Sequence, residues 1–110
     1  MNAVETSAPP APRTTSGPTV SAVVVAHNEE AQLADCLATL SFADEVVVLL
    51  DRCTDRSREV ASRVADRIIE GTWPREAARR HAAIAACTGD WIFEADADER
   101  VSPALAAEIQ

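Results

Sequence analysis

The sequence predicts an α/β fold, with a mainly parallel four-stranded sheet and helices on both faces. Three observations lead to this prediction. Short apolar runs alternate with helical patterns in the order β-α-β-α-β-α-β-α. The apolar runs show little polar alternation, which is typical of strands that are buried on both faces of a parallel sheet. Polar residues then gather where several of these runs end.

The first predicted strand and helix come early in the chain. Residues 19–26 (TVSAVVVA) are rich in β-branched side chains, which favours a short strand. The polar run HNEE at residues 27–30 ends it. Residues 31–40 (AQLADCLATL) then place leucines at helical spacing, so we expect a helix with one apolar face.

The middle of the chain repeats this alternation. Residues 45–50 (EVVVLL) predict a second strand. Residues 54–65 (TDRSREVASRVA) predict a second helix, and either Thr54 or Asp55 could cap its start. A short third strand is expected at residues 67–70 (RIIE).

The last part of the chain predicts two helices around a fourth strand. Residues 75–87 (REAARRHAAIAAC) favour a helix, and Gly89 is a suitable residue just past its end. Residues 91–95 (WIFEA) predict the strand. Ser102 followed by Pro103 is the pattern of an N-cap and a first-turn proline, which predicts a final helix.

Composition limits the possible domain organisation and binding partners. The net charge of −8 argues against binding nucleic acid, because neutralising phosphates requires a basic face. No apolar run approaches the length of a membrane span. Residues 1–18 are rich in Pro, Ser, Thr and Ala and predict a disordered leader before one domain at 19–110. Three widely spaced cysteines support neither a disulfide framework nor a zinc site, so we expect a reduced, cytoplasmic protein.

Polar residues follow three of the predicted strands. They are His27, Asn28 and Glu29 after the first, Asp51 after the second, and the acidic run at 96–99 after the fourth. The carboxyl ends of parallel strands share one edge, where open α/β sheets bind ligands, so these residues predict a site. Helix capping and turn formation are the alternative roles for Asn28, Glu29 and Asp51, and His27 could be a turn residue.

The acidic run places Asp96 and Asp98 two residues apart. Along a strand this spacing separates Cα atoms by about 7 Å, so the two carboxylates suit different tasks, one on a metal and one on a nearby hydroxyl. Mg²⁺ and Mn²⁺ prefer such oxygen ligands and complete their shells with water and substrate phosphate. The alternative is a strand end whose acids point into solvent. The arginines on or near the predicted third helix, Arg75, Arg79 and Arg80, could pair with phosphate or lie on an exposed face.

Three segments together resemble family 2 glycosyltransferases of the GT-A fold. They are VSAVVVAHNEEAQLADCLATL, EVVVLLDRCTDRSREVA and GDWIFEADADERVSPAL, in this order and spacing. The last resembles bacterial members that build lipopolysaccharide or other cell-envelope glycans. The resemblance implies a Rossmann-like GT-A half-domain over residues 19–110, binding a nucleotide-diphospho-sugar (UDP- or GDP-sugar) through Mg²⁺ or Mn²⁺. It further implies sugar transfer, with inversion, to a glycan or lipid-linked acceptor, which is compatible with peripheral membrane association.

The resemblance also implies roles for individual residues. Asp51 would lie beside the nucleobase, Asp96 would approach the ribose or the sugar, and Asp98 would hold the metal. The full set implied for the nucleotide-sugar is Ala26, His27, Asn28, Glu29, Asp51, Arg80 and Asp96.

The chain departs from the family pattern in several places. Arg52 stands where a second acid is common, Cys53 and Arg56 stand in a loop that commonly has glycines, and Glu94 replaces an apolar residue. Members usually run well past this length, and their second half supplies the acceptor pocket and the general base. We therefore expect a truncated donor-binding half whose catalytic base is unknown.

Two other functions are consistent with parts of the pattern. One is a catalytically incomplete nucleotide-binding or partner-binding module of the same fold. The other is a phosphotransferase of the haloacid dehalogenase type, which also uses an Asp-x-Asp motif. In that type, however, the motif follows the first strand rather than the fourth.

Overall fold

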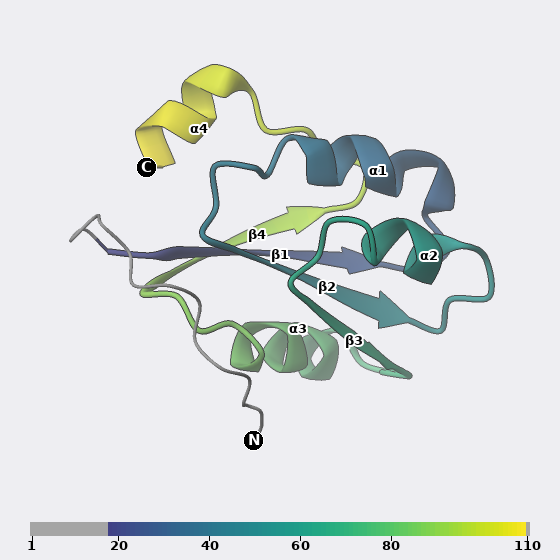
Figure 1. Ribbon diagram of the computed structural model, residues 1–110. Helices are drawn as coiled ribbons and strands as arrows, with labels where there is room; N and C mark the ends of the chain where they lie inside the picture. The colour runs from purple at the N-terminus through teal and green to yellow at the C-terminus, as the bar shows by residue number, and fades with distance from the viewer. Residues whose placement is uncertain (1–17, 110) are drawn as a thin grey trace.

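The computed structural model describes residues 18–109, so the predicted leader at 1–18 lies outside the described residues except for Pro18. Strands and helices alternate along this part of the chain (Figure 1). The elements are β1 (Val20–Ala26), α1 (Glu30–Ala38), β2 (Glu45–Asp51), α2 (Ser57–Ala61), β3 (Arg67–Gly71), α3 (Glu76–Ala85), β4 (Trp91–Asp96) and α4 (Pro103–Ile109).

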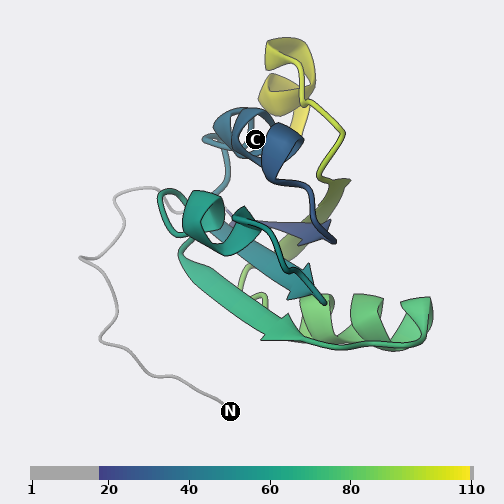
Figure 2. The ribbon, with the colours of Figure 1, turned by 90° about the vertical axis from the view of Figure 1, so that its right-hand side faces the viewer.

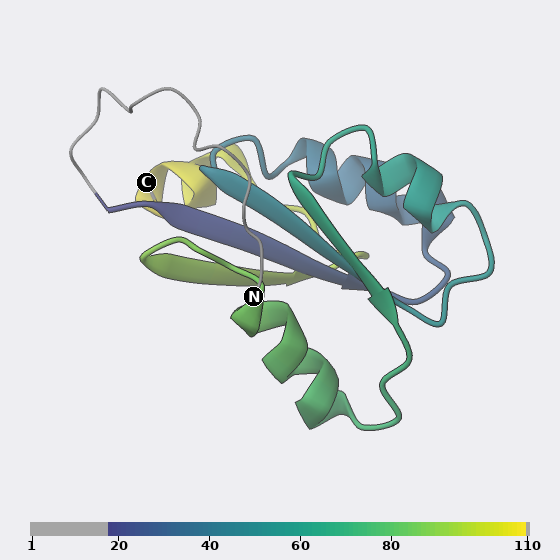
Figure 3. The same ribbon diagram turned by 60° about the horizontal axis from the view of Figure 1, so that its bottom comes forward.

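All four strands are parallel and lie in the order β3-β2-β1-β4 (Figure 3). This confirms the predicted α/β class and the parallel sheet. The two central strands, β1 and β2, are buried along nearly their whole length, as their continuous apolar sequences predict. The edge strands β3 and β4 are more exposed, and Trp91 at the start of β4 is 65% exposed. The expectation that every strand is buried on both faces is therefore wrong for the edges.

Helices cover both faces of the sheet, as predicted. α1 and α2 pack on one face and α3 on the other, while α4 lies on the same side as α1 (Figure 2). The alternating side chains of β1 and β2 divide between the two cores. The buried residues of the α1 and α2 core include Ala22, Val24, Leu33, Leu37, Val48, Leu50 and Ala61. The α3 core is smaller and centres on Val23, Val47, Leu49 and Ala83.

The second helix is shorter than its sequence predicts. Residues 54–65 predict a helix, but α2 spans only Ser57–Ala61. The N–H groups of Thr54 and Asp55 instead bind the Asn28 side chain, which fixes these residues in a loop. Of the two candidate caps, Asp55 does support the helix start, because its Oδ1 accepts the N–H of Ser57 at 2.9 Å.

Two further boundaries test the sequence reading. The predicted cap of the last helix is confirmed, since Ser102 Oγ accepts the N–H of Leu105 at 3.1 Å. The predicted role of Gly89 is wrong, because its φ is not positive and α3 ends earlier, at Ala85. Gly89 is instead needed for close approach: its N–H donates to Ser21 Oγ at 2.7 Å, and a Cβ there would lie 2.7 Å from the Ser21 backbone nitrogen.

The helices are short. Within residues 18–109, none is long and apolar enough to cross a membrane.

Candidate functional site at the carboxyl ends of the strands

The strand order reverses between β1 and β4, and their carboxyl ends form the edge of a pocket. Val25 of β1 lies opposite Asp96 of β4 in the parallel register. A pocket of about 230 Å³ opens here, lined by Val25, His27, Glu29, Arg79, Asp96, Ala97 and Asp98. A second pocket, of about 360 Å³, continues between β4 and α3 and shares Val25, Arg79 and Asp96 with the first. Such a crevice at a reversal of strand order is where open α/β sheets bind ligands.

The structure brings four of the predicted site residues to the smaller pocket, namely His27, Glu29, Asp96 and Asp98. Arg80 lines the larger pocket, together with Glu94. Ala26, Asn28 and Asp51 line neither of these two pockets. Ala26 is buried at the end of β1, in the core beneath α1 and α2.

Asn28 joins the loop after β1 to the loop after β2. Its Oδ1 accepts the N–H of Thr54 at 2.7 Å and that of Asp55 at 3.2 Å. Its own N–H donates to Cys53 Sγ at 3.3 Å. Asn28 has a φ of 52°, in the left-handed region that asparagine tolerates better than most residues. The side chain therefore holds the site's loops together.

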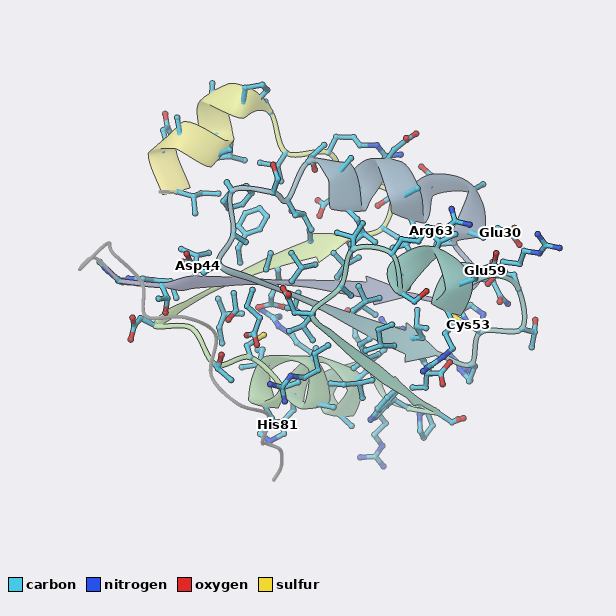
Figure 4. The ribbon with its side chains drawn as sticks, viewed as in Figure 1. Glu30, Asp44, Cys53, Glu59, Arg63 and His81 are labelled. Atoms are coloured by element: carbon cyan, nitrogen blue, oxygen red, sulfur yellow. The ribbon has the colours of Figure 1, made fainter. Side chains whose placement is uncertain are left out.

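The same two loops make further contacts (Figure 4). Glu30, at the start of α1, donates its N–H to Asp55 Oδ2 at 3.0 Å, and its Oε1 accepts the N–H of Arg56 at 3.3 Å. Cys53, in the loop after β2, contacts the Ala26 carbonyl through Sγ at 3.4 Å. The sequence Arg-Cys-Thr-Asp-Arg thus forms this loop without any glycine.

Asp51 is fully buried and its carboxylate is occupied. Oδ1 accepts the N–H of Trp73 and Arg52 Nε, both at 3.1 Å. Oδ2 accepts Arg79 Nη1 at 3.2 Å and Arg52 Nη2 at 3.3 Å. Burial raises the pKa of Asp51, but the hydrogen bonds from Trp73, Arg52 and Arg79 outweigh it, so the pKa lies below its ordinary value. Asp51 is therefore ionised and held by four donors.

His27 links the ends of the two central strands. Its Nδ1 lies 2.7 Å from the Asp51 carbonyl oxygen. Because a carbonyl can only accept a hydrogen bond, Nδ1 carries the proton. This bond fixes the ring beside the smaller pocket.

The acidic run after β4 is a compact turn. Glu99 Oε1 accepts the N–H of Asp96 at 2.7 Å, and the Asp96 carbonyl accepts the N–H of Glu99 at 2.9 Å. Burial raises the pKa of Asp96, and the charges of Glu99 and Asp98 raise it further, whereas Arg79 opposes them. Asp96, Asp98 and Glu99 all remain exposed, so water screens part of their repulsion.

The donor set fits a hard divalent cation. Asp96 and Asp98 present carboxylate oxygens to one pocket, and Mg²⁺ or Mn²⁺ is commonly held by one or two carboxylates together with phosphate and water. Within residues 18–109 there is no group of three or more His, Cys, Asp or Glu arranged to hold a metal on its own. A cation here would therefore need ligands from a bound phosphate or from water.

The residue set implied by the resemblance leaves out two residues of the larger pocket. Arg79 is one of several helix arginines that could pair with phosphate, and it lies four residues before Ala83, the buried residue that faces the sheet, so it shares that side of α3. Glu94, which the family pattern does not explain, pairs with Arg80 through two contacts of 2.9 and 3.2 Å. The helical spacing from Ala83 is the signal that could have identified Arg79.

Comparison with known proteins places this geometry in a family. The model of the family described as Glycosyl transferase family 2 matches residues 21–109. An uncharacterised glycosyltransferase of Rickettsia typhi is 29% identical over 92 residues, which cover 83% of this chain and 32% of the relative. The lipopolysaccharide core biosynthesis glycosyltransferase LpsC of Rhizobium meliloti is 31% identical over 91 residues, covering 78% of this chain and 34% of the relative. The chain thus spans about a third of the length of these relatives.

Solved structures show the same fold. Glucosyl-3-phosphoglycerate synthase from Mycobacterium tuberculosis in complex with UDP superposes with a TM-score of 0.67 and 26% identity, over 76% of this chain and 35% of that one. A complex of the same enzyme with Mn²⁺, UDP and glucosyl-3-phosphoglycerate gives a TM-score of 0.67 at 24% identity, over 76% of this chain and 36% of that one. The parallel sheet and its helices are therefore the GT-A arrangement that the resemblance implies. With the family model matching most of its length, this chain belongs to glycosyl transferase family 2.

Proposed function

We propose that this chain binds a nucleotide-diphospho-sugar at the carboxyl ends of β1, β2 and β4, through Mg²⁺ or Mn²⁺. The sugar is transferred, with inversion, to a glycan or lipid-linked acceptor. The observation that carries the proposal is the single pocket in which His27 and Glu29 of the β1 loop meet Asp96 and Asp98 of the β4 turn. Membership of the family and the UDP complex of the solved neighbour support it.

The residues divide the work by their chemistry. Asp98 holds the cation, which when bound offsets the charge that develops on the leaving diphosphate. Asp96 accepts a hydrogen bond from a hydroxyl of the ribose or the sugar. His27 and Glu29 form the opposite wall of the pocket, fixed by the Asp51 carbonyl and by Ser57 Oγ, which accepts the N–H of Glu29 at 3.1 Å.

We place this reaction in the cytoplasm. Cys36, Cys53 and Cys87 are all free thiols, which fits a reducing compartment. A lipid-linked acceptor would bring the protein to a membrane surface.

Calorimetry with UDP and GDP tests the proposal. UDP or GDP is expected to bind in the presence of Mn²⁺, and EDTA should abolish the binding. Asp98→Asn is expected to lose the Mn²⁺-dependent binding of the nucleotide. The matched control is Asp35→Asn, which changes the charge equally on the exposed face of α1. Metal-dependent binding that survives in Asp98→Asn would refute the role given to Asp98.

A transfer assay distinguishes a glycosyltransferase from a catalytically incomplete binding module. UDP release from a UDP-sugar in the presence of a glycan acceptor supports transfer. Metal-dependent binding without any release supports the nucleotide-binding or partner-binding module. The phosphotransferase alternative gains no support, because the Asp-Ala-Asp motif follows the edge strand β4 rather than β1.

A further inference from the structure

We propose that Arg79 binds the diphosphate of the donor, and that Asp51 is a positioning residue for Arg79 rather than a ligand of the nucleobase. This inference rests on the proposed function, because it concerns the same nucleoside diphosphate. It departs from the role that the family resemblance implies for Asp51.

The contacts of Asp51 leave it no free acceptor for a base. The side chain is fully buried, and each carboxylate oxygen already accepts two hydrogen bonds within the protein. A nucleobase could reach this carboxylate only by displacing Arg52, Arg79 or the Trp73 N–H. Each of these donors would then have to find another partner, which makes the exchange unfavourable.

The charges around Asp51 favour an anion at Arg79. One carboxylate is shared by two guanidinium groups, so the cluster of Asp51, Arg52 and Arg79 carries one net positive charge. Arg80 differs, because its contacts with Glu94 form a two-point pair that neutralises it. Of the two arginines that line the pockets in the described part of the chain, Arg79 thus shares its carboxylate partner with Arg52, whereas Arg80 has Glu94 to itself.

The position of Arg79 matches that role. It lines both pockets, whose shared wall also contains Asp96 and Val25. Its side chain is 26% exposed, and within residues 18–109 Asp51 is its one hydrogen-bonded side-chain partner, through Nη1. A guanidinium has five N–H donors in a planar fork, so Arg79 can hold Asp51 and still present donors to a phosphate. Through this contact, Asp51 holds the long, flexible side chain of Arg79 in the geometry that phosphate binding needs.

The test compares two nucleoside diphosphates, UDP and GDP, by calorimetry with Mn²⁺. Arg79→Ala is expected to weaken both by the same factor, about tenfold to a hundredfold, as for the loss of a hydrogen bond to a charged group. Arg79→Lys, which keeps the charge but loses the fork, should recover part of this loss. Asp51→Asn should also weaken UDP and GDP equally, leaving their affinity ratio as in the wild type.

The ratio of the two affinities decides between the roles of Asp51. If Asp51 contacts the base, Asp51→Asn changes the ratio of UDP to GDP affinity, and that result overturns the proposal. Unchanged binding by Arg79→Ala overturns it as well. Should Asp51→Asn fail to fold, as judged by circular dichroism, Asp51→Glu takes its place in the ratio test, and the two Arg79 variants decide whether Arg79 binds the diphosphate. Arg63→Ala is the control for removal of an arginine, because Arg63 lies in the exposed turn after α2 and pairs with Glu59 of that helix (Figure 4). If wild-type protein binds neither nucleotide, it is the proposed function that fails.

Discussion

Replacing Asn28 with alanine is expected to loosen the loop that follows β2. The change removes the acceptor of two backbone N–H groups, those of Thr54 and Asp55, at about 0.5–1.5 kcal/mol each. It also puts a Cβ-bearing residue without a local hydrogen bond at a φ of 52°, which costs about 1 kcal/mol more. The free energy of unfolding should therefore fall by about 2–4 kcal/mol.

Two further variants of Asn28 separate these contributions. Asn28→Gly loses the hydrogen bonds but accepts a positive φ freely, so it should be about 1 kcal/mol more stable than Asn28→Ala. Asn28→Asp keeps the acceptor and should stay near the wild type. Urea unfolding followed by circular dichroism measures the stability of all three variants. In thermal melts, the midpoint temperature should shift by about 4–8 °C per kcal/mol. Wild-type stability of Asn28→Ala would refute the reasoning, since the loop would then not depend on this side chain.

Two other predictions concern buried contacts. The depressed pKa of Asp51 contributes stability above the pKa of the unfolded state, about 3.9, which is lost as the pH falls through the lower folded value. In thermal melts between neutral and acidic pH, the stability of Asp51→Asn should therefore fall less steeply than that of the wild type. An equally steep fall would contradict this prediction. Gly89→Ala places a Cβ 2.7 Å from the Ser21 backbone and should cost about 1–3 kcal/mol in urea unfolding. Gly71→Ala should cost less, because its nearest neighbour, at 2.8 Å, is the Trp73 ring, which can move; equal costs would refute this explanation.

The sequence was a good guide to the elements and to the edge on which polar residues meet. The β-branched runs of β1 and β2 and the leucines of α1 predict their burial, because each pattern is local. What the sequence could not predict depends on contacts between distant segments. The late start of α2 depends on Asn28, from the loop after β1, and the need for Gly89 is set by Ser21 of β1.

The same limit applies to the candidate site. His27, Glu29, Asp96 and Asp98 follow strand ends, so parallel topology alone brings them together. The pairing of arginines with acids was not predictable, since a helix face does not show which residues of another strand it will meet. Asp51 therefore looked like an open ligand, whereas the structure buries it beneath two arginines.

Paramagnetic broadening by Mn²⁺ in the presence of UDP tests the central claim most directly. If a metal-chelated nucleotide binds at the carboxyl ends of the strands, the backbone amide signals of Ala97 and Asp98 should broaden first. Those of Glu45 and Gly89, at the opposite ends of the strands, should broaden least. The effect should disappear in Asp98→Asn. Broadening centred on the opposite ends, or retained in that variant, would contradict the account.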